Sequence, residues 1–357
     1  MNFLFFSRYN LYDIDDKKGG DLSNIEIINE LAKLGSVSLA NAYNFTHGNR
    51  LNHIKQILLT DALKYTWPLF LISQYINKMQ LYENHFDFIV APKGGIIAAY
   101  LLSMKYHIPL VIVSRDFHEL PYFGPKYGKS YLRDLIKYIL LRKIWKKAYE
   151  SAYCVITSSN YLGKKITSSY KIKHQTTLYP LVKDPMKTRS LSLSSPIGMI
   201  SGSKYKGEKV VIELAIRMPN RKFVIFNSVS NSPVPINVER KGYVSKEEMF
   251  NSISLLIVPS DVRESFGRVV IESHFFGVPC LAHDIGGLRE ALSISLLRVG
   301  YGNINEWNEK IEKILCNNPI FHSAVIDSIY KSKQTFVLSN HRKVIHSVFC
   351  PKKINIV

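Results

Sequence analysis

The segment 255–292 constrains the fold of this chain more than any other, because it alternates between strand and helix patterns. The short apolar run 255–258 is typical of a buried strand. Apolar residues at helical spacing over 269–276 predict a helix that ends at Gly277. A second apolar run, 278–282, predicts another strand. This alternation predicts a parallel doubly wound sheet, in which ligands bind where the strands end.

Two carboxylates border the predicted helix. Glu264 lies in the loop before it, and Glu272 lies about 7 to 8 Å along the helix axis if the helix begins near Gly267. A diphosphate at the helix N-terminus would face the N–H groups of Phe266 and Gly267. Each carboxylate could then accept hydrogen bonds from a pair of hydroxyl groups, such as those of a sugar and a ribose. For Glu272, a solvated helix position is the alternative.

A second glycine-containing loop, 201–207, follows the apolar run 197–200 and precedes a predicted helix over 210–217. Lys206 in this loop could neutralise phosphate charge as a leaving group departs. An ordinary surface lysine is the alternative. Together, the two carboxylates, the lysine and the helix N-terminus favour an anionic, hydroxyl-rich ligand.

The beginning of the chain shows the same order of strand, glycines and helix. A strand is predicted over 2–7, Gly19 and Gly20 follow in a loop, and Ser23 is expected to cap a helix with Glu26 in a capping box. Backbone N–H groups at such a helix start can meet a phosphate or a sugar. Alternatively, the glycines only allow a tight turn.

A polar cluster follows the predicted strand 109–114 in the same half. It contains Arg115, Asp116 and His118, and the end of a parallel strand is where ligands bind. An ordinary hydrogen-bonded loop histidine is the alternative for His118. Residues 50–82, which precede this strand, are predicted to form two helices.

The chain has 357 residues, enough for two domains, and a formal net charge of +19. This charge implies an anionic partner, either a nucleic acid, an anionic membrane or a phosphorylated substrate. The four cysteines have no paired ligand spacing, which favours free thiols in a reducing compartment and no zinc site. No apolar stretch reaches the roughly 18 residues of a membrane span, so a cytoplasmic protein is expected.

The most basic part of the chain is a predicted helix over 126–147, where Lys and Arg residues lie among apolar residues at helical spacing. Such a helix could make a peripheral contact with the inner face of an anionic cell membrane. A helix packed on the core, with its charges in solvent, is the alternative.

The segment 259–292 resembles the signature region of glycosyltransferase family 4, the retaining, nucleotide-sugar-dependent enzymes of GT-B fold. Outside this segment, three pairs of residues also resemble the family pattern: a lysine–glycine pair in the second half, and a glycine pair and a polar pair after a strand in the first half. The matching residues are Glu264, Glu272, Gly277-Val278-Pro279, Gly286-Gly287-Leu288-Arg289-Glu290, Lys206-Gly207, Gly19-Gly20 and Arg115-Asp116.

The resemblance implies a role for each matched residue. Glu264 would bind the hydroxyl groups of the donor sugar, Glu272 the ribose, and Lys206 the diphosphate. Asp116 or His118 would line the acceptor side, so that Glu264, Lys206, Asp116 and His118 are the expected catalytic residues. The remaining implied donor-binding residues are Gly19, Gly20, Gly202, Lys204, Ser265, Phe266 and Gly267.

Some positions depart from the family pattern. Ser203 stands where a basic residue usually follows the glycine of the first C-terminal loop, and Lys204 is expected to substitute for it. Arg115 stands where a histidine is often found, and Tyr179-Pro180-Leu181 replaces an asparagine–glycine turn. No Asp-x-Asp metal pair stands at a strand end, so transfer without a metal or other cofactor is expected.

We therefore expect an α/β protein of GT-B architecture, with two doubly wound, Rossmann-like domains facing each other across the active-site cleft. The expected domains are an N-terminal acceptor-side domain over 1–180 and a nucleotide-sugar-binding domain over 197–335. A linker rich in Pro, Ser and Lys, 181–196, would join them. A C-terminal helix or tail over 336–357 could return to the first domain.

The expected activity is transfer of a hexose or related sugar from a nucleotide diphosphate sugar to an acceptor hydroxyl, with retention of configuration. The acceptor would be a glycan or a lipid-linked molecule in the assembly of a cell-surface polysaccharide, lipopolysaccharide or glycolipid. One alternative is a non-catalytic, glycosyltransferase-like subunit that binds a sugar nucleotide or a partner. Another is a DNA-glucosylating or nucleic-acid-binding protein, although no nucleic-acid-binding motif occurs.

Overall fold

The computed structural model describes residues 1–7, 19–41, 54–58, 85–117, 120, 129–182, 194–203, 205–228 and 230–350. The chain forms two compact units. The first comprises Met1–Leu181 and Leu338–Val357, and the second Val182–Val337. Each unit is built on a parallel sheet, so the predicted doubly wound α/β fold is confirmed.

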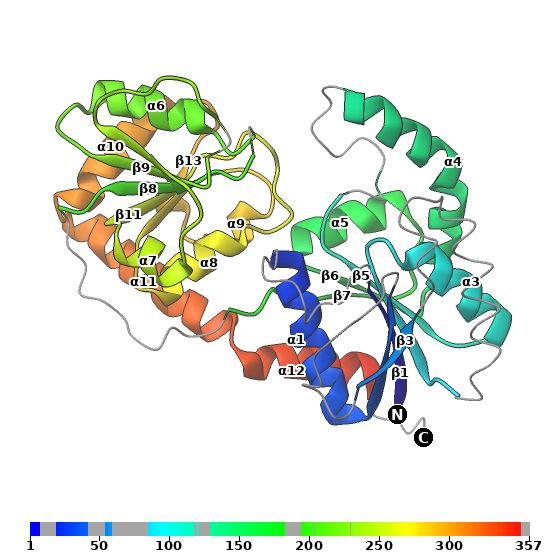
Figure 1. Ribbon diagram of the computed structural model, residues 1–357. Helices are drawn as coiled ribbons and strands as arrows, with labels where there is room; N and C mark the ends of the chain where they lie inside the picture. The colour runs from blue at the N-terminus through cyan, green and yellow to red at the C-terminus, as the bar shows by residue number, and fades with distance from the viewer. Residues whose placement is uncertain are drawn as a thin grey trace. The chain divides into compact units, whose positions relative to one another are not determined.

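The first unit contains a seven-stranded sheet in the order β3-β2-β1-β4-β5-β6-β7 (Figure 1). Its strands are β1 (Asn2–Ser7), β2 (Ser36–Asn41), β3 (Ile54–Leu58), β4 (Phe88–Pro92), β5 (Leu110–Ser114), β6 (Cys154–Thr157) and β7 (Gln175–Thr177). Its helices include α1 (Gly19–Leu34), α3 (Ile96–Tyr106), α4 (Lys129–Ser151), α5 (Asn160–Ser169) and α12 (Leu338–Phe349). The strand order reverses between β1 and β4, which creates the switch point where such sheets bind ligands.

Strand β1 lies in the middle of this sheet and is buried on both faces. Phe3 and Phe5 face a core layer that includes residues of α1 and α12, whereas Leu4 and Phe6 face a layer that includes residues of α3, α4 and α5. Successive side chains of a strand point to opposite faces, and helices cover both faces here. A continuous apolar run is therefore what this position requires.

The last described helix, α12, belongs to the first unit although the preceding helix belongs to the second. The ring of Phe349 packs edge-on against Phe3 and Phe88, with centroid distances of 5.4 and 5.1 Å. Arg342 Nε lies 3.0 Å from Glu30 Oε2 on α1. The end of the chain thus completes the core layer under β1.

The second unit contains a six-stranded sheet in the order β10-β9-β8-β11-β12-β13. Its strands are β8 (Ile197–Ile200), β9 (Phe223–Phe226), β10 (Val238–Lys241), β11 (Leu255–Val258), β12 (Cys280–His283) and β13 (Arg298–Val299). Its helices are α6 (Glu208–Arg217), α7 (Lys246–Asn251), α8 (Arg268–Phe275), α9 (Leu288–Ala291), η2 (Ser295–Leu297), α10 (Ile304–Leu315) and α11 (Pro319–Thr335). Helices α6 and α10 cover one face, and α8 and α11 cover the other (Figure 1). The switch point of this sheet lies between β8 and β11.

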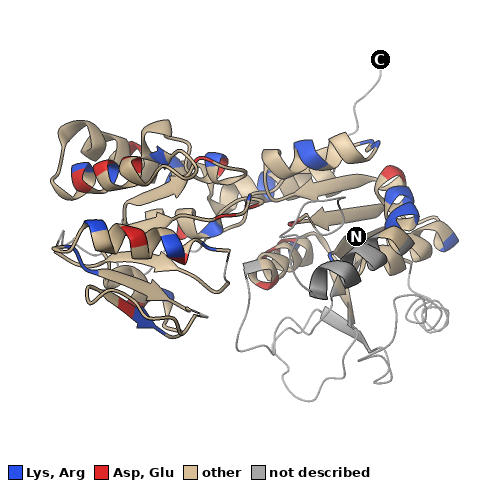
Figure 2. Cartoon of the chain, turned by 90° about the horizontal axis from the view of Figure 1, so that it is seen from above, with Lys and Arg blue, Asp and Glu red and all other residues tan. Residues whose placement is uncertain are grey.

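The basic helix α4 packs on the core over its described side chains. Leu141, Trp145 and Ala148 are buried, whereas Arg142 and Lys143 are exposed. Its apolar face therefore serves the core and its positive charges lie in solvent. In the second unit, basic and acidic residues instead alternate along the helices (Figure 2). No helix among the described residues is long and apolar enough to cross a membrane.

Two local predictions were wrong. A helix was expected to include Ile54–Leu58, whose apolar residues fit a helical spacing, but this segment is β3 and pairs with β2 at the sheet edge. Ser23 was expected to cap the first helix, but α1 begins at Gly19 and Ser23 is buried inside it. The Arg115 side chain donates to Gly20 O and to the Asn24 side chain, and these long-range contacts hold the first turn helical. The remainder of 50–82 lies outside the described residues.

We predict that acid destabilises the second unit through His274 on α8. Its Nδ1 lies 2.7 Å from Ser332 Oγ on α11, and burial lowers its pKa to about 3. In the unfolded chain the His274 imidazole is protonated near pH 6.5, whereas in the folded chain it stays neutral down to about pH 3. Below pH 6.5 the unfolding free energy should therefore fall by up to about 1.4 kcal/mol per pH unit. Urea unfolding at pH 7 and pH 5 measures the loss. His274→Asn keeps an amide opposite Ser332 and cannot titrate. Between pH 7 and pH 5 this variant should therefore lose about 2 kcal/mol less unfolding free energy than the wild type. Equal losses would contradict the prediction.

Candidate functional site

Two helices begin at the switch point of the second sheet without a side-chain cap. Gly207 precedes α6 and Gly267 precedes α8, with φ values of 87° and 101°. Because the residue at each cap position is a glycine, neither helix receives a side-chain hydrogen bond from its N-cap. Helices α7, α10 and α11 of the same unit are instead capped by Ser245, Asn303 and Asn318. Helix starts of this kind are places where backbone N–H groups can bind an anion.

Glycines let the three loops at this edge pack backbone against backbone. A Cβ atom on Gly207 would lie 1.9 Å from Pro259 O. The N–H of Gly287 donates to Glu264 O at 2.8 Å, and a Cβ atom on Gly287 would lie 2.2 Å from Ser265 O. The loops after β8, β11 and β12 are thus held together, and the glycine pairs noted in the sequence serve this packing.

Lys206 and Glu264 form an ion pair between the loops after β8 and β11. Lys206 Nζ lies 2.8 Å from Glu264 Oε1, and the side chains are 34% and 15% exposed. The Ser260 hydroxyl also donates to Glu264 Oε1. Both contacts described for this carboxylate use Oε1, which leaves Oε2 to accept from a ligand. Lys206 is therefore part of a cluster and not an ordinary surface lysine.

Glu272 lies in the second turn of α8 and is buried, with only 7% of its surface exposed. Its Oε1 atom lies 2.8 Å from Arg268 Nε and 2.5 Å from Lys246 Nζ. The alternative of a solvated helix position was therefore wrong. A buried carboxylate requires such partners because its desolvation is costly. The sequence pattern did not indicate Lys246, which reaches Glu272 from the start of α7.

The charged side chains of these two separate ion-paired groups sum to one net positive charge. Lys206, Lys246 and Arg268 stand against Glu264 and Glu272. The partial positive charge of two helix N-termini adds to this balance. The site therefore favours a ligand with negative charge, and its carboxylates favour one that also has hydroxyl groups.

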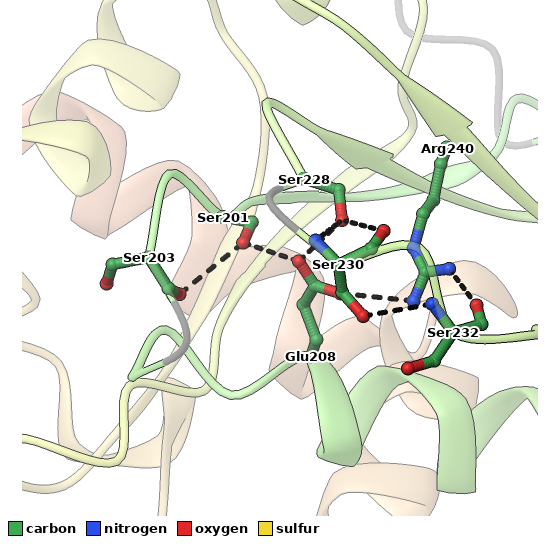
Figure 3. A network of polar contacts seen from close by, with 7 residues as sticks. All are labelled: Ser201, Ser203, Glu208, Ser228, Ser230, Ser232 and Arg240. Carbon is green, nitrogen blue, oxygen red and sulfur yellow. Dashed lines mark hydrogen bonds and ion pairs between the residues drawn. The ribbon is translucent and has the colours of Figure 1, made fainter.

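A network around Glu208 fixes the loop that carries Lys206 (Figure 3). Glu208 Oε1 accepts from Ser201 Oγ at 2.6 Å and from Ser228 Oγ at 2.8 Å. Its other oxygen lies 3.3 Å from Arg240 Nη2 on β10. Glu208 is the first residue of α6, so this network joins the loops after β8 and β9 at the helix start. Residues Gly202, Ser265 and Phe266 belong to the loops of this same edge, and Lys204 lies outside the described residues.

In the first unit, Asp116 lies at the carboxyl end of the sheet and forms an ion pair with a lysine of the neighbouring loop. Asp116 follows β5, and its Oδ2 lies 2.7 Å from Nζ of Lys93, which follows β4. Gly19 and Gly20 lie in the first turn of α1, not in a loop, so that expectation was wrong. His118 lies outside the described residues. The sequence reasoning missed Lys93, although its position directly after a strand could have indicated it.

A pocket of about 10 Å³, the size of one water molecule, lies near Asp116 at this edge of the first unit. Its lining includes Ser114 and His341, both buried. Ser114 Oγ and His341 Nδ1 have no hydrogen-bond partner among the described residues. Burial lowers the pKa of His341 to about 4. Arg115 also lines the pocket, which thus offers a polar place for a single water or hydroxyl group.

Part of the second unit matches a known family. Residues 204–338 match the family model described as Glycosyl transferases group 1. A 42.6 kDa protein in the cps region of Klebsiella pneumoniae is 26% identical over 212 residues, which cover 55% of this chain and 56% of that protein. The chain therefore matches about half the length of this curated relative.

Two solved structures share the fold of the whole chain. A glycosyltransferase from Rickettsia africae aligns with a TM-score of 0.70 and 14% identity, over 98% of this chain and 99% of that one. HepE of Anabaena, solved with UDP-glucose, aligns with a TM-score of 0.69 and 16% identity, over 97% and 98% of the two chains. The two units therefore have the GT-B fold, and residues 204–338 are similar to the group 1 glycosyl transferases.

We predict that Gly207→Ala destabilises the second unit more than Gly277→Ala. Both glycines have a left-handed backbone conformation, with φ values of 87° and 77°. Alanine at such a φ costs about 1–2 kcal/mol. Only Gly207→Ala also places a Cβ atom against backbone, whereas nothing lies within 4 Å of a Cβ atom on Gly277. The extra overpacking should cost a further 1–3 kcal/mol or so in urea unfolding. Equal losses would show that the loop after β11 can move away from Gly207.

Proposed function

We propose that this chain, with its GT-B fold and its similarity to the group 1 glycosyl transferases, is a retaining glycosyltransferase that uses a nucleotide diphosphate sugar. The observation that carries the proposal is the pair of uncapped helix starts, α6 and α8, beside the Lys206–Glu264 ion pair. A diphosphate matches the N–H groups and the net positive charge, and a sugar matches the carboxylates. The closeness of these groups at one sheet edge supports a single donor site.

The diphosphate is proposed to bind the first N–H groups of α6 and α8. As the bond to the sugar breaks, negative charge builds on the departing diphosphate, and groups already in place stabilise it most. Lys206 is proposed to neutralise this charge by turning from Glu264 toward the phosphate. In this proposal Lys206 and the two helix N-termini provide the charge, without a metal.

The two glutamates are proposed to bind the two hydroxyl-bearing parts of the donor. Glu264 would accept from hydroxyl groups of the transferred sugar through Oε2, because Oε1 is held by Lys206 and Ser260. Glu272, fixed by Arg268 and Lys246, would accept from the ribose. Asp116 and His118 of the first unit are proposed to line the acceptor side.

A nucleotide sugar and a surface glycan are the proposed substrate classes. HepE, whose fold the chain shares, was solved with UDP-glucose, and the Klebsiella relative lies in the cps region. Both findings support a UDP-sugar donor and an acceptor in cell-surface polysaccharide assembly. A non-catalytic subunit would bind the same donor without turnover, so turnover separates the two functions.

We predict that a panel of nucleotide sugars contains one donor that raises the melting temperature clearly above the others. A ligand at a hundredfold excess over its Kd stabilises the folded state by about 2.7 kcal/mol. The selected donor should then be turned over, and Glu264→Gln should lower kcat about 100-fold. Glu213→Gln on the exposed face of α6 is the matched control and should keep the wild-type rate. The proposal fails if no donor shifts the melting temperature, or if Glu264→Gln turns over at the wild-type rate.

We further propose that the exposed basic face of α4 attaches the first unit to an anionic membrane, where a lipid-linked acceptor would lie. The apolar residues Leu141 and Trp145 are buried in the core, so attachment would be electrostatic and without insertion. Charge carries this proposal, because Leu141 and Trp145 are occupied by the core, although Ile139 of the same helix is 51% exposed.

The matching prediction is that vesicles with an anionic lipid pellet the protein at low salt, and neutral vesicles do not. Salt of about 1 M, with a Debye length near 3 Å, should release it. Arg142→Glu with Lys143→Glu should reduce binding, whereas Lys222→Glu with Lys331→Glu on the second unit should not. Equal loss for both pairs would mean that net charge, and not α4, binds the vesicles.

A further inference from the structure

A buried chain of hydrogen bonds reaches Glu264 from the core of the second unit. Trp307 on α10 donates its Nε1–H to His283 Nε2 at 3.1 Å, and His283 Nδ1 lies 3.0 Å from Ser260 O. Trp307, His283 and Ser260 are only 1%, 1% and 0% exposed. The Ser260 hydroxyl then donates to Glu264 Oε1. Three side chains thus connect a core helix with the carboxylate of the donor site.

The partners of His283 determine which of its nitrogens carries the proton. The indole N–H of Trp307 can only donate, so His283 Nε2 must accept and has no hydrogen. The single proton of the neutral ring is then on Nδ1, which donates to the carbonyl oxygen of Ser260. Burial lowers the pKa of His283 and favours this neutral form, although the Ser260 carbonyl and Asp261 oppose the shift. The ring therefore has one orientation and one tautomer that satisfy both neighbours.

Ser260 connects His283 to the Glu264 carboxylate through its own carbonyl and hydroxyl groups. It directly follows Pro259, whose carbonyl packs against Gly207, and it stands four residues before Glu264. Its carbonyl is held by His283, and its hydroxyl holds the same Glu264 oxygen that pairs with Lys206. Without His283 the Ser260 peptide could rotate, and the hydroxyl would no longer have a fixed position opposite Glu264.

We infer that His283, whose tautomer is set by Trp307, is a positioning residue for the donor site and acts through Ser260 on Glu264. This inference rests on the proposed role of Glu264 in binding the donor sugar. Both side chains are buried, so we expect their effect to be on the orientation of Glu264. Small displacements of a positioned group can slow a reaction about 100-fold.

Three substitutions of His283 separate its two hydrogen bonds. Asn places an amide N–H where Nδ1 lies, so His283→Asn keeps the donor to Ser260 and loses the acceptor for Trp307. Gln reaches the Nε2 position, so His283→Gln keeps the acceptor and loses the donor. His283→Leu loses both. Each variant is tested with the donor selected by the nucleotide-sugar panel, for kcat, for donor KM and for melting temperature.

The expected result is that turnover follows the bond to Ser260. His283→Asn should keep kcat within about threefold of the wild type, whereas His283→Gln and His283→Leu should lower it about 10- to 100-fold. Donor KM should change less than kcat, and Ser260→Ala should match His283→Gln. Ser332→Ala removes a similar buried bond to a histidine, His274, and should leave kcat unchanged.

Other outcomes overturn the inference. A purely structural role for His283 would make kcat follow melting temperature across all the variants, Ser332→Ala included. Activity in His283→Gln but not in His283→Asn would assign the effect to Trp307 alone. If Glu264→Gln slows turnover while His283→Gln and His283→Leu do not, this inference is wrong and the proposed function stands. If Glu264→Gln turns over normally, the proposed function is wrong as well.

Discussion

A helix that begins without a cap leaves its first N–H groups to solvent or to a ligand, and the donor site depends on two such helices. Helices α6 and α8 both start at a glycine in a left-handed conformation, where a capping side chain is missing by necessity. The cost of these open ends is tolerable because they lie at a strand end, where an anion can satisfy them. The contacts around Glu208 and between Gly207 and Pro259 keep both ends in place.

The Lys206–Glu264 pair contributes orientation more than stability. Lys206 is one-third exposed, and ion pairs in such places stabilise a fold by about 1 kcal/mol or less. The pair instead holds a cation and a carboxylate ready beside the open helix ends. Glu272 differs, because its carboxylate is buried and its desolvation would destabilise the fold without the ion pairs to Arg268 and Lys246. One glutamate can thus exchange its partner for a ligand, while the other stays fixed.

The sequence was sufficient for the parts of the site that depend on local pattern. Glu264, Lys206 and the glycines of the second unit lie in loops between strong strand and helix signals, and Glu272 lies on the helix that follows. Their common edge therefore follows from the parallel topology. The edge strands β7, β10 and β13 were missed, because they are short and carry polar residues that only pairing makes into strands. Ser23 failed as a cap for a related reason, since contacts with Arg115 lengthen α1.

Residues that act through tertiary contact left no sequence signal. Lys246, Arg268 and His283 are ordinary residues in their own segments, and only folding brings them to Glu272 and Ser260.

The most direct test of the donor site is amide hydrogen exchange with and without the nucleoside diphosphate of the best donor. Binding at these helix starts should slow exchange in 207–209 and 267–269, since the N–H groups of Val210 and Val270 are already hydrogen-bonded. Slowed exchange confined to the first unit, or unchanged exchange at both helix starts, would contradict this site.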